Sequence, residues 1–136
     1  MKAPDVVLRN ALVGNASFTA LAGTRIHPLM VPSGTALPWV VYRRVGITRE
    51  QGLGGPIGAP KMRLEYTAVG ATYAAARTLA DAIRAVLDGY YGTSENTTVN
   101  NVSLDDEADD LAQLDGAEFP NAFAVRQTYE VIYQEP

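Results

Sequence analysis

The clearest periodic pattern in the chain lies over residues 72–88, where apolar side chains recur at helical spacing. The apolar positions there are Ala76, Leu79, Ile83, Val86 and Leu87. Such spacing places one apolar stripe along one side of an α-helix. Thr72 is a suitable N-cap, and Gly89 suits the left-handed turn that ends many helices. The pattern therefore predicts a long amphipathic helix over about residues 72–88.

Strict alternation of apolar and polar positions predicts β-strands at residues 61–69 and 122–133. Residues 39–45 are rich in β-branched and aromatic side chains, which also favour a strand. A weaker pattern predicts a strand at residues 97–104. Residues 25–28 predict a short edge strand that ends at a proline, which cannot donate to a ladder.

The order of these elements predicts an α+β fold. Residues 5–13 form a short N-terminal helix in this scheme, because apolar residues lie four positions apart. A single helical turn is expected over residues 17–21. The predicted order is helix, short strand, two strands, helix and two strands. This order favours a mostly antiparallel four- to five-stranded sheet with the long helix packed on one face. No repeat or boundary divides the chain, so residues 1–136 are expected to form one domain.

Residues 46–60 break the pattern between two predicted strands. They contain five glycines and two prolines: Gly46, Gly52, Gly54, Gly55, Gly58, Pro56 and Pro60. A loop of more than about 12 residues in a compact domain is usually functional or disordered. The composition therefore predicts a long flexible loop at the end of a hairpin. It lacks the Gly-Lys-Ser/Thr of a phosphate-binding loop and leads into a strand, so phosphate binding is not expected.

Charge is unevenly distributed along the chain, whose net charge is −4. Five basic residues surround the predicted hairpin: Arg43, Arg44, Arg49, Lys61 and Arg63. Seven acids lie in a turn-like segment, residues 105–118, and five of them form a run at its start: Asp105, Asp106, Glu107, Asp109 and Asp110. Two explanations stay open. Charge of both signs keeps a surface soluble, and complementary charge sets the register between a basic side of one copy and an acidic side of the next.

The residue types needed for common catalytic sites are scarce. The chain has no cysteine and one histidine, His27, so catalytic triads and common zinc sites are not expected. The acidic run does not match a calcium-binding EF-hand, because Gly116 stands where the twelfth-position acid belongs. We therefore expect no catalytic, metal or cofactor site, and no enzyme.

No apolar run of about 18 residues is present, and no signal-type apolar segment follows the N-terminus, so a soluble cytoplasmic protein is expected. The basic hairpin 43–63 could contact nucleic acid. Its aromatic neighbours Trp39, Tyr42 and Tyr66 are better explained as core than as a stacking platform for bases. Sequence-specific recognition of nucleic acid is therefore not expected.

Several segments, in this order, carry a family resemblance. They are Ala20-Leu21-Ala22-Gly23-Thr24-Arg25-Ile26-His27-Pro28, Leu37-Pro38-Trp39-Val40-Val41-Tyr42, the glycine-rich hairpin, Gly70-Ala71-Thr72-Tyr73 and Gln127-Thr128-Tyr129-Glu130-Val131-Ile132-Tyr133. Together they resemble the tail-completion proteins of long-tailed, siphovirus-type bacteriophages, which include tail terminators and tail-to-head joining proteins. His27 stands where a tyrosine is common, and Trp39 where tyrosine or phenylalanine is. The acidic segment has no counterpart.

The resemblance implies a structural virion protein that forms a ring, commonly a hexamer. Such a ring caps the tail tube, ends its polymerisation and provides the head-docking surface, and DNA passes through it. The implied partners are further copies of the chain, the major tail-tube protein and head-completion or neck proteins. The implied location is the host cytoplasm during assembly and then the head-proximal end of the tail.

Two alternatives stay open: a head-completion or other neck adaptor, and a small nucleic-acid-binding module that uses the hairpin. The candidate contacts to other copies or to the tube are Arg43, Arg44, Arg49, Gly52, Gly54, Gly55, Lys61, Arg63, Asp105, Asp106, Glu107, Asp109 and Asp110.

Overall fold

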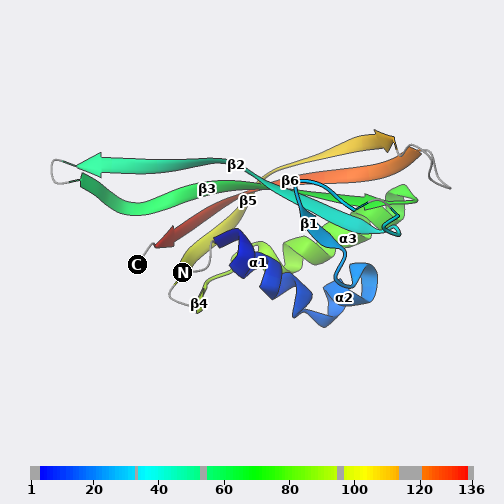
Figure 1. Cartoon of the computed structure of the whole chain (residues 1–136), viewed down its shortest axis with the longest axis horizontal. Helices are drawn as coiled ribbons and strands as arrows, with labels where there is room; N and C mark the ends of the chain where they lie inside the picture. Colours follow the sequence, from blue (N-terminus) through cyan, green and yellow to red (C-terminus); the bar gives the residue numbers. More distant parts are fainter. Residues whose placement is uncertain (1–3, 33, 53–54, 95–96, 114–120, 135–136) are drawn as a thin grey trace.

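A computed structural model describes residues 4–32, 34–52, 55–94, 97–113 and 121–134. In this part of the chain, three helices lie against one curled sheet of six strands (Figure 1). The elements are α1 (Pro4–Val13), α2 (Ala16–Ala22), β1 (Ile26–Pro28), β2 (Trp39–Gly52), β3 (Gly55–Gly70), α3 (Tyr73–Leu87), β4 (Gly92–Ser94), β5 (Thr97–Gln113) and β6 (Asn121–Gln134).

The α+β class is confirmed, but the sheet is larger than predicted and mixed. Its strand order is β1-β2-β3-β6-β5-β4. All neighbouring strands are antiparallel except β1 and β2, which run parallel. The predicted edge position of residues 26–28 is confirmed. The sequence did not predict β4, because a three-residue strand is too short to show a period.

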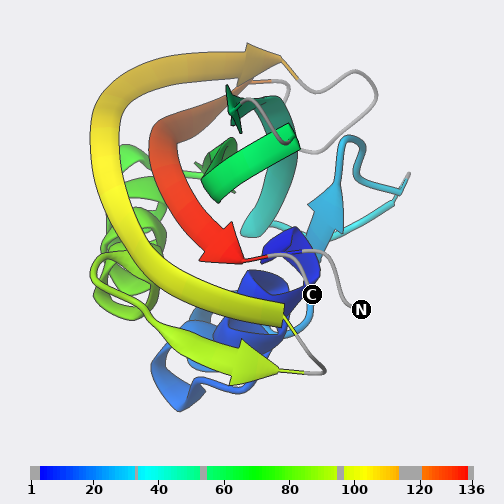
Figure 2. The ribbon, with the colours of Figure 1, turned by 90° about the vertical axis from the view of Figure 1, so that its left-hand side faces the viewer.

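The sheet curls strongly around the helical side of the molecule, and β5 follows the widest arc (Figure 2). The pairing of β2 with β3 shifts register twice: an extra residue lies on β2 between Arg44 and Gly46, and extra residues lie on β3 between Ile57 and Lys61. Two more register shifts interrupt β5, between Val99 and Asn101 and between Leu104 and Asp106. Extra residues of this kind bend a strand and increase its twist. Strands β2, β3 and β5 therefore carry the bends that help to curve the sheet.

The predicted loop over residues 46–60 is wrong. β2 continues to Gly52 and β3 begins at Gly55, and these two residues form the last pair of the hairpin. Residues 53–54 lie outside the described residues. The glycine and proline content does not predict these strand extensions, because each strand is held by backbone pairing with the other. The prolines are tolerated because β6 reaches β3 only at Lys61, so residues 55–60 pair on one side.

The predicted acidic turn is also wrong as far as the structure describes it. β5 runs to Gln113, and residues 106–113 pair with β6. Residues 114–118 lie outside the described residues. Acidic side chains oppose strand formation weakly when they meet solvent, and residues 105–109 are exposed. Pairing with the strongly patterned β6 therefore decides the conformation of this segment.

The main core lies between the helices and the concave face of the sheet. Its large, fully buried side chains include Tyr66, Tyr129, Tyr133, Phe18, Leu8, Leu12, Leu79 and Ile83. The predicted helix cap is confirmed, because Thr72 Oγ1 accepts a hydrogen bond from the Ala75 amide at 3.1 Å. The predicted left-handed glycine is confirmed at Gly89, whose φ is 83°. A smaller cluster on the opposite face joins Val69, Ala122 and Ala124 to Leu37 and Trp39.

Gly70, the last residue of β3, lets α3 begin directly against the sheet. A Cβ atom at this position would lie 2.8 Å from the Ala76 amide nitrogen and 3.0 Å from Ala75 Cβ. Both atoms belong to the first turns of α3, so backbone would have to move to make room. The absence of a side chain at Gly70 thus sets how closely the helix approaches.

We expect Gly70→Ala to lower the free energy of unfolding by about 1–3 kcal/mol, the usual effect of overpacking. Gly46→Ala is the matched control, because a Cβ there meets no atom within 4 Å. Chemical denaturation followed by circular dichroism measures both. Equal losses in the two variants would contradict the close-approach explanation.

Candidate functional site

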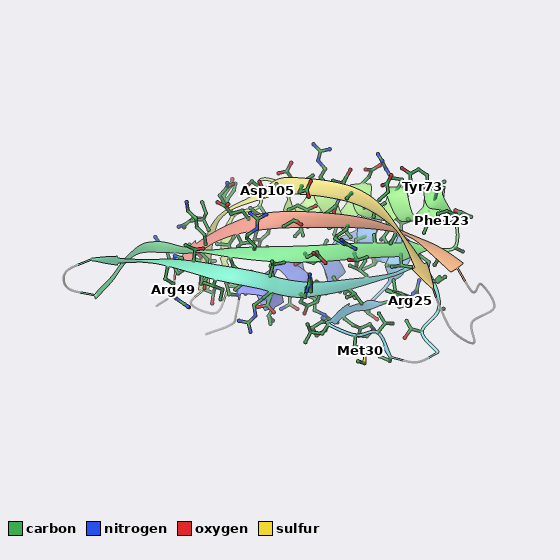
Figure 3. All side chains as sticks on the ribbon, turned by 90° about the horizontal axis from the view of Figure 1, so that it is seen from above. Arg25, Met30, Arg49, Tyr73, Asp105 and Phe123 are labelled. Carbon is green, nitrogen blue, oxygen red and sulfur yellow. The ribbon has the colours of Figure 1, made fainter. Side chains whose placement is uncertain are left out.

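Figure 3 looks onto the face of the sheet that is turned away from the helices. Charged side chains of four strands form ion pairs on this face. Arg43 Nε on β2 lies 3.2 Å from Glu65 Oε1 on β3. Arg126 Nε on β6 lies 3.7 Å from the same Glu65 oxygen. Arg63 on β3 reaches past β6 to Asp105 on β5, at 2.6 Å. Two of the predicted basic contact residues are therefore paired with acids of their own chain.

The Arg63–Asp105 pair connects the basic hairpin with the acidic segment inside one molecule. The strand order explains it, because only β6 separates β3 from β5. Both side chains stay partly exposed, at 44% and 46%. An ion pair with this exposure contributes little to stability, typically less than about 1 kcal/mol.

The remaining predicted contact residues are placed as follows. Arg44 and Lys61 are exposed on the hairpin, and Arg49, also exposed, has interactions of its own. Gly52 and Gly55 form the last described pair of the hairpin, and Gly54 lies outside the described residues. Asp106 is exposed opposite Thr128, and Asp110 lies opposite Ala124.

Two of the predicted acids point toward the helices instead of away from them. Gln127 Nε2 donates to Glu107 Oε2 at 2.7 Å and to the Ala80 carbonyl at 3.1 Å. Tyr129 Oη donates to Gln127 Oε1 at 2.8 Å. Burial raises the pKa of the Tyr129 phenol, and the nearby carboxylate of Asp88 raises it further. This network fastens β6 to both α3 and β5, so Glu107 has a structural role.

The other inward acid, Asp109, supports an aromatic pair at the start of α3. Tyr73 Oη donates to Asp109 Oδ2 at 2.8 Å, and Arg77 Nη1 donates to Tyr73 Oη at 3.3 Å. The Arg77 guanidinium carbon lies 6.0 Å from the centre of the Tyr73 ring. Phe123 of β6 packs edge-on against that ring, with centroids 6.4 Å apart. Both rings remain exposed.

The outer edge of β1 has its backbone groups satisfied. The Ile26 amide donates to the Thr24 carbonyl at 2.9 Å, and Arg9 Nε donates to the Ile26 carbonyl at 3.4 Å. Pro28 has no amide hydrogen, and its carbonyl accepts from the Met30 amide at 2.7 Å. A further strand would find few groups to pair with along β1.

Longer parts of β2 and β5 are open on their outer sides. β1 covers β2 only at Val40–Tyr42, and β4 covers β5 only at Thr97–Val99. The Gly89 amide and the Asp88 carboxylate cover the next stretch of β5, at Val102 and Leu104. Beyond these points, the described residues give each strand a partner on one side only. Such edges can accept another chain.

Leu29 and Met30 project from the end of β1 with 76% and 78% of their surface exposed. Leu29 has a φ of 64°, a left-handed conformation that costs a branched residue about 1–3 kcal/mol. Its amide is bonded to the Tyr42 carbonyl at 2.8 Å. Neither this pair nor the Tyr73–Phe123 pair was predicted from the sequence. No pattern marked them, because isolated apolar residues in loops and at element ends are common.

The described residues contain no group of three or more His, Cys, Asp or Glu side chains that could hold a metal ion. A shallow depression of about 410 Å³ beside α3 is lined by Asp81, Arg84, Ala85 and Asp88. Its Arg84–Asp88 pair, 3.7 Å apart, is exposed. None of the three described helices is long and apolar enough to cross a membrane.

The family model described as tail completion protein gp17 matches residues 6–132. A chain in the structure described as the virion of a native gene transfer agent particle has a similar fold. The TM-score is 0.74 at 13% sequence identity, and the match covers 97% of this chain and 96% of the other. No curated protein sequence matches significantly.

The buried tyrosines of the core make a matched pair for mutation. Tyr66 Oη is buried without a hydrogen-bond partner, whereas Tyr129 Oη is bonded to Gln127. We expect Tyr66→Phe to leave stability unchanged or raise it slightly, and Tyr129→Phe to lower it by about 1–2 kcal/mol. Thermal unfolding at pH 7 measures both effects.

Alkaline titration adds a second measurement on the same variants. Burial raises the pKa of the Tyr66 phenol well above its usual value near 10. As the pH rises, the unfolded chain therefore loses this proton before the folded chain does. The phenol has its full effect on the free energy of unfolding below about pH 10, and stability falls as the pH rises further. Tyr66→Phe should shift the alkaline loss of structure to higher pH. An unchanged alkaline midpoint, or a large loss of stability at pH 7, would contradict this account.

Proposed function

Because the chain belongs to the tail completion protein gp17 family, we propose that it forms a ring on the end of the phage tail tube. The family gives it a structural role in a phage-like tail. In our proposal the ring ends polymerisation of the tube and offers the surface on which the head docks. The family match over residues 6–132 is the observation that carries this proposal.

Ring closure requires two unlike surfaces on opposite sides of one subunit. The sheet supports this requirement, because its two edges differ in charge and in backbone pairing. The open part of β2 begins at two arginines, Arg43 and Arg44, whereas the open part of β5 begins among acids at Asp105 and Asp106. Opposite charges on the two edges favour head-to-tail contact and disfavour contact between like edges.

The proposed mechanism is surface recognition, in which no bond is made or broken. The long β2–β3 hairpin extends beyond the helices at one end of the molecule (Figure 1). We assign this projecting part, residues 47–62, to contact with the tube or with a neighbouring copy. The residues at the base of this part belong to the core, since Met62 is buried and Ile47 packs against the core cluster.

A neck adaptor is the second candidate, and a nucleic-acid module is the third. The ion pairs of Arg43 and Arg63 disfavour the module, because they reduce the positive charge available for phosphates. An adaptor that acts on the head would bind without changing tube growth. The three candidates therefore differ in one measurable property, the effect on tail-tube length.

We expect the purified chain to self-associate and to shorten tubes when it is added to polymerising tail-tube subunits. Negative-stain microscopy of the tubes measures their length and shows any ring at their ends. Monomers in light scattering together with unchanged tube lengths would contradict the terminator function. Binding to heads with unchanged tubes would favour the adaptor. Neutralising Arg43, Arg44 and Arg49 tests the third candidate. Loss of DNA affinity with intact assembly would favour the nucleic-acid module.

A shortened hairpin tests the role of the projecting segment. Thr48 and Lys61 lie directly opposite each other, so an Asn-Gly turn can join them and replace residues 49–60. We expect nearly unchanged thermal stability, because the last core pair, Ile47 and Met62, is retained. Ring or tube association should be lost. Arg84→Ala, an exposed change on α3, is the control. Normal tube capping by the shortened chain would contradict the assigned role.

A further inference from the structure

Two groups of exposed apolar side chains lie toward opposite edges of the sheet (Figure 3). Leu29 and Met30 follow β1 on one side, with 76% and 78% of their surface exposed. Tyr73 and Phe123 lie on the β5 side, with 43% and 40% exposed. Large apolar side chains clustered on a surface mark interaction sites. The two groups are unlike, as a head-to-tail contact requires.

Leu29 and Met30 are held in their projecting position by backbone hydrogen bonds. The Leu29 amide donates to the Tyr42 carbonyl at 2.8 Å, and the Met30 amide donates to the Pro28 carbonyl at 2.7 Å. The positive φ of Leu29 ends the extended backbone of β1 at this point. An exposed group with a fixed backbone loses little freedom when it binds. The same bonds leave few backbone groups at this edge for strand addition, so contact has to be made by side chains.

Tyr73 and Phe123 form a similarly fixed surface. Their rings pack edge to face at an interplanar angle of 74°. The Tyr73 hydroxyl is already engaged by Asp109 and Arg77. What the pair offers to a partner is therefore ring surface. Thioether and branched aliphatic side chains pack favourably on such rings.

The two groups are staggered along the strands. One row of backbone partners crosses the sheet from β1 to β5, through Ile26, Val40, Ala68, Val125 and Asp109. Asp109 holds the Tyr73 hydroxyl at one end of this row. At the other end, Leu29 lies three residues beyond Ile26 toward the β2–β3 hairpin, whereas Phe123 lies two residues from Val125 in the opposite direction. A neighbour displaced sideways and also along the strands, by roughly 16 Å, would therefore bring the two groups together.

We propose that Leu29 and Met30 of one copy pack on Tyr73 and Phe123 of the next copy. This inference rests on the ring function proposed above and assigns its subunit contact. Leu29 is bonded to Tyr42, next to Arg43 of β2. Tyr73 is bonded to Asp109 of β5, so charges of opposite sign accompany the two groups and would set the orientation of the contact. The occupant of each surface is thus a second copy of the same chain.

Cross-linking tests the contact directly, because the chain contains no cysteine. The double variant Met30→Cys/Phe123→Cys, treated with a short bis-maleimide, should give a ladder of oligomers up to the full ring. An equimolar mixture of the two single variants should give dimers that contain one copy of each. Tyr91→Cys/Phe123→Cys is the matched control. Tyr91 is 77% exposed but lies just before β4, on the same side of the sheet as Phe123, and should give no ladder.

A second measurement does not depend on the reagent. Met30→Asp should raise the concentration needed for self-association about tenfold or more, as expected for a central interface residue. Tyr91→Asp should change it little. Both positions are exposed, so the fold should survive both changes.

The outcomes separate this contact from the ring function. Rings that form without cross-links between positions 30 and 123 would overturn the contact and leave the ring function standing. Cross-linking of the single Met30→Cys variant to itself, or to a tail-tube subunit instead of another copy, would also overturn it. A wild-type chain that neither self-associates nor shortens tail tubes would overturn both proposals.

Discussion

The packing of α3 against the concave face of β3 and β6 is the contact on which the rest of the structure depends. The buried side of α3 meets the buried tyrosines of these two central strands, and Gly70 lets the helix start against the sheet. The Gln127 side chain then bonds α3 to β6 at the Ala80 carbonyl. Because the helices occupy one face, the other face and both edges remain for charge pairs and for contact with other molecules.

The sequence predicted the parts of the fold that depend on local periodicity. The stripe of α3, the alternation of β6 and the cap at Thr72 lie where the pattern placed them. Strand extension was missed, because the glycine-rich part of β2–β3 and the acidic part of β5 are held by partners distant in sequence. The parallel pairing of β1 with β2 depends on the path that the chain takes between the two strands, which no local pattern predicts.

The candidate contacts could be predicted only in part for the same reason. Composition identified a basic and an acidic segment, but it could not show that Arg63 and Asp105 pair within one molecule. Nor could it show that Glu107 and Asp109 turn toward the helices. The exposed apolar groups at Leu29–Met30 and Tyr73–Phe123 depend on burial, which only the assembled fold defines.

The two different edges of the sheet suit the closed ring that we propose as the functional unit. Cryo-electron microscopy of tails assembled in the presence of the chain tests that claim most directly. We expect one ring of this chain at one end of each tube, and none along its length. Tails of normal length that carry no such ring at either end would contradict it.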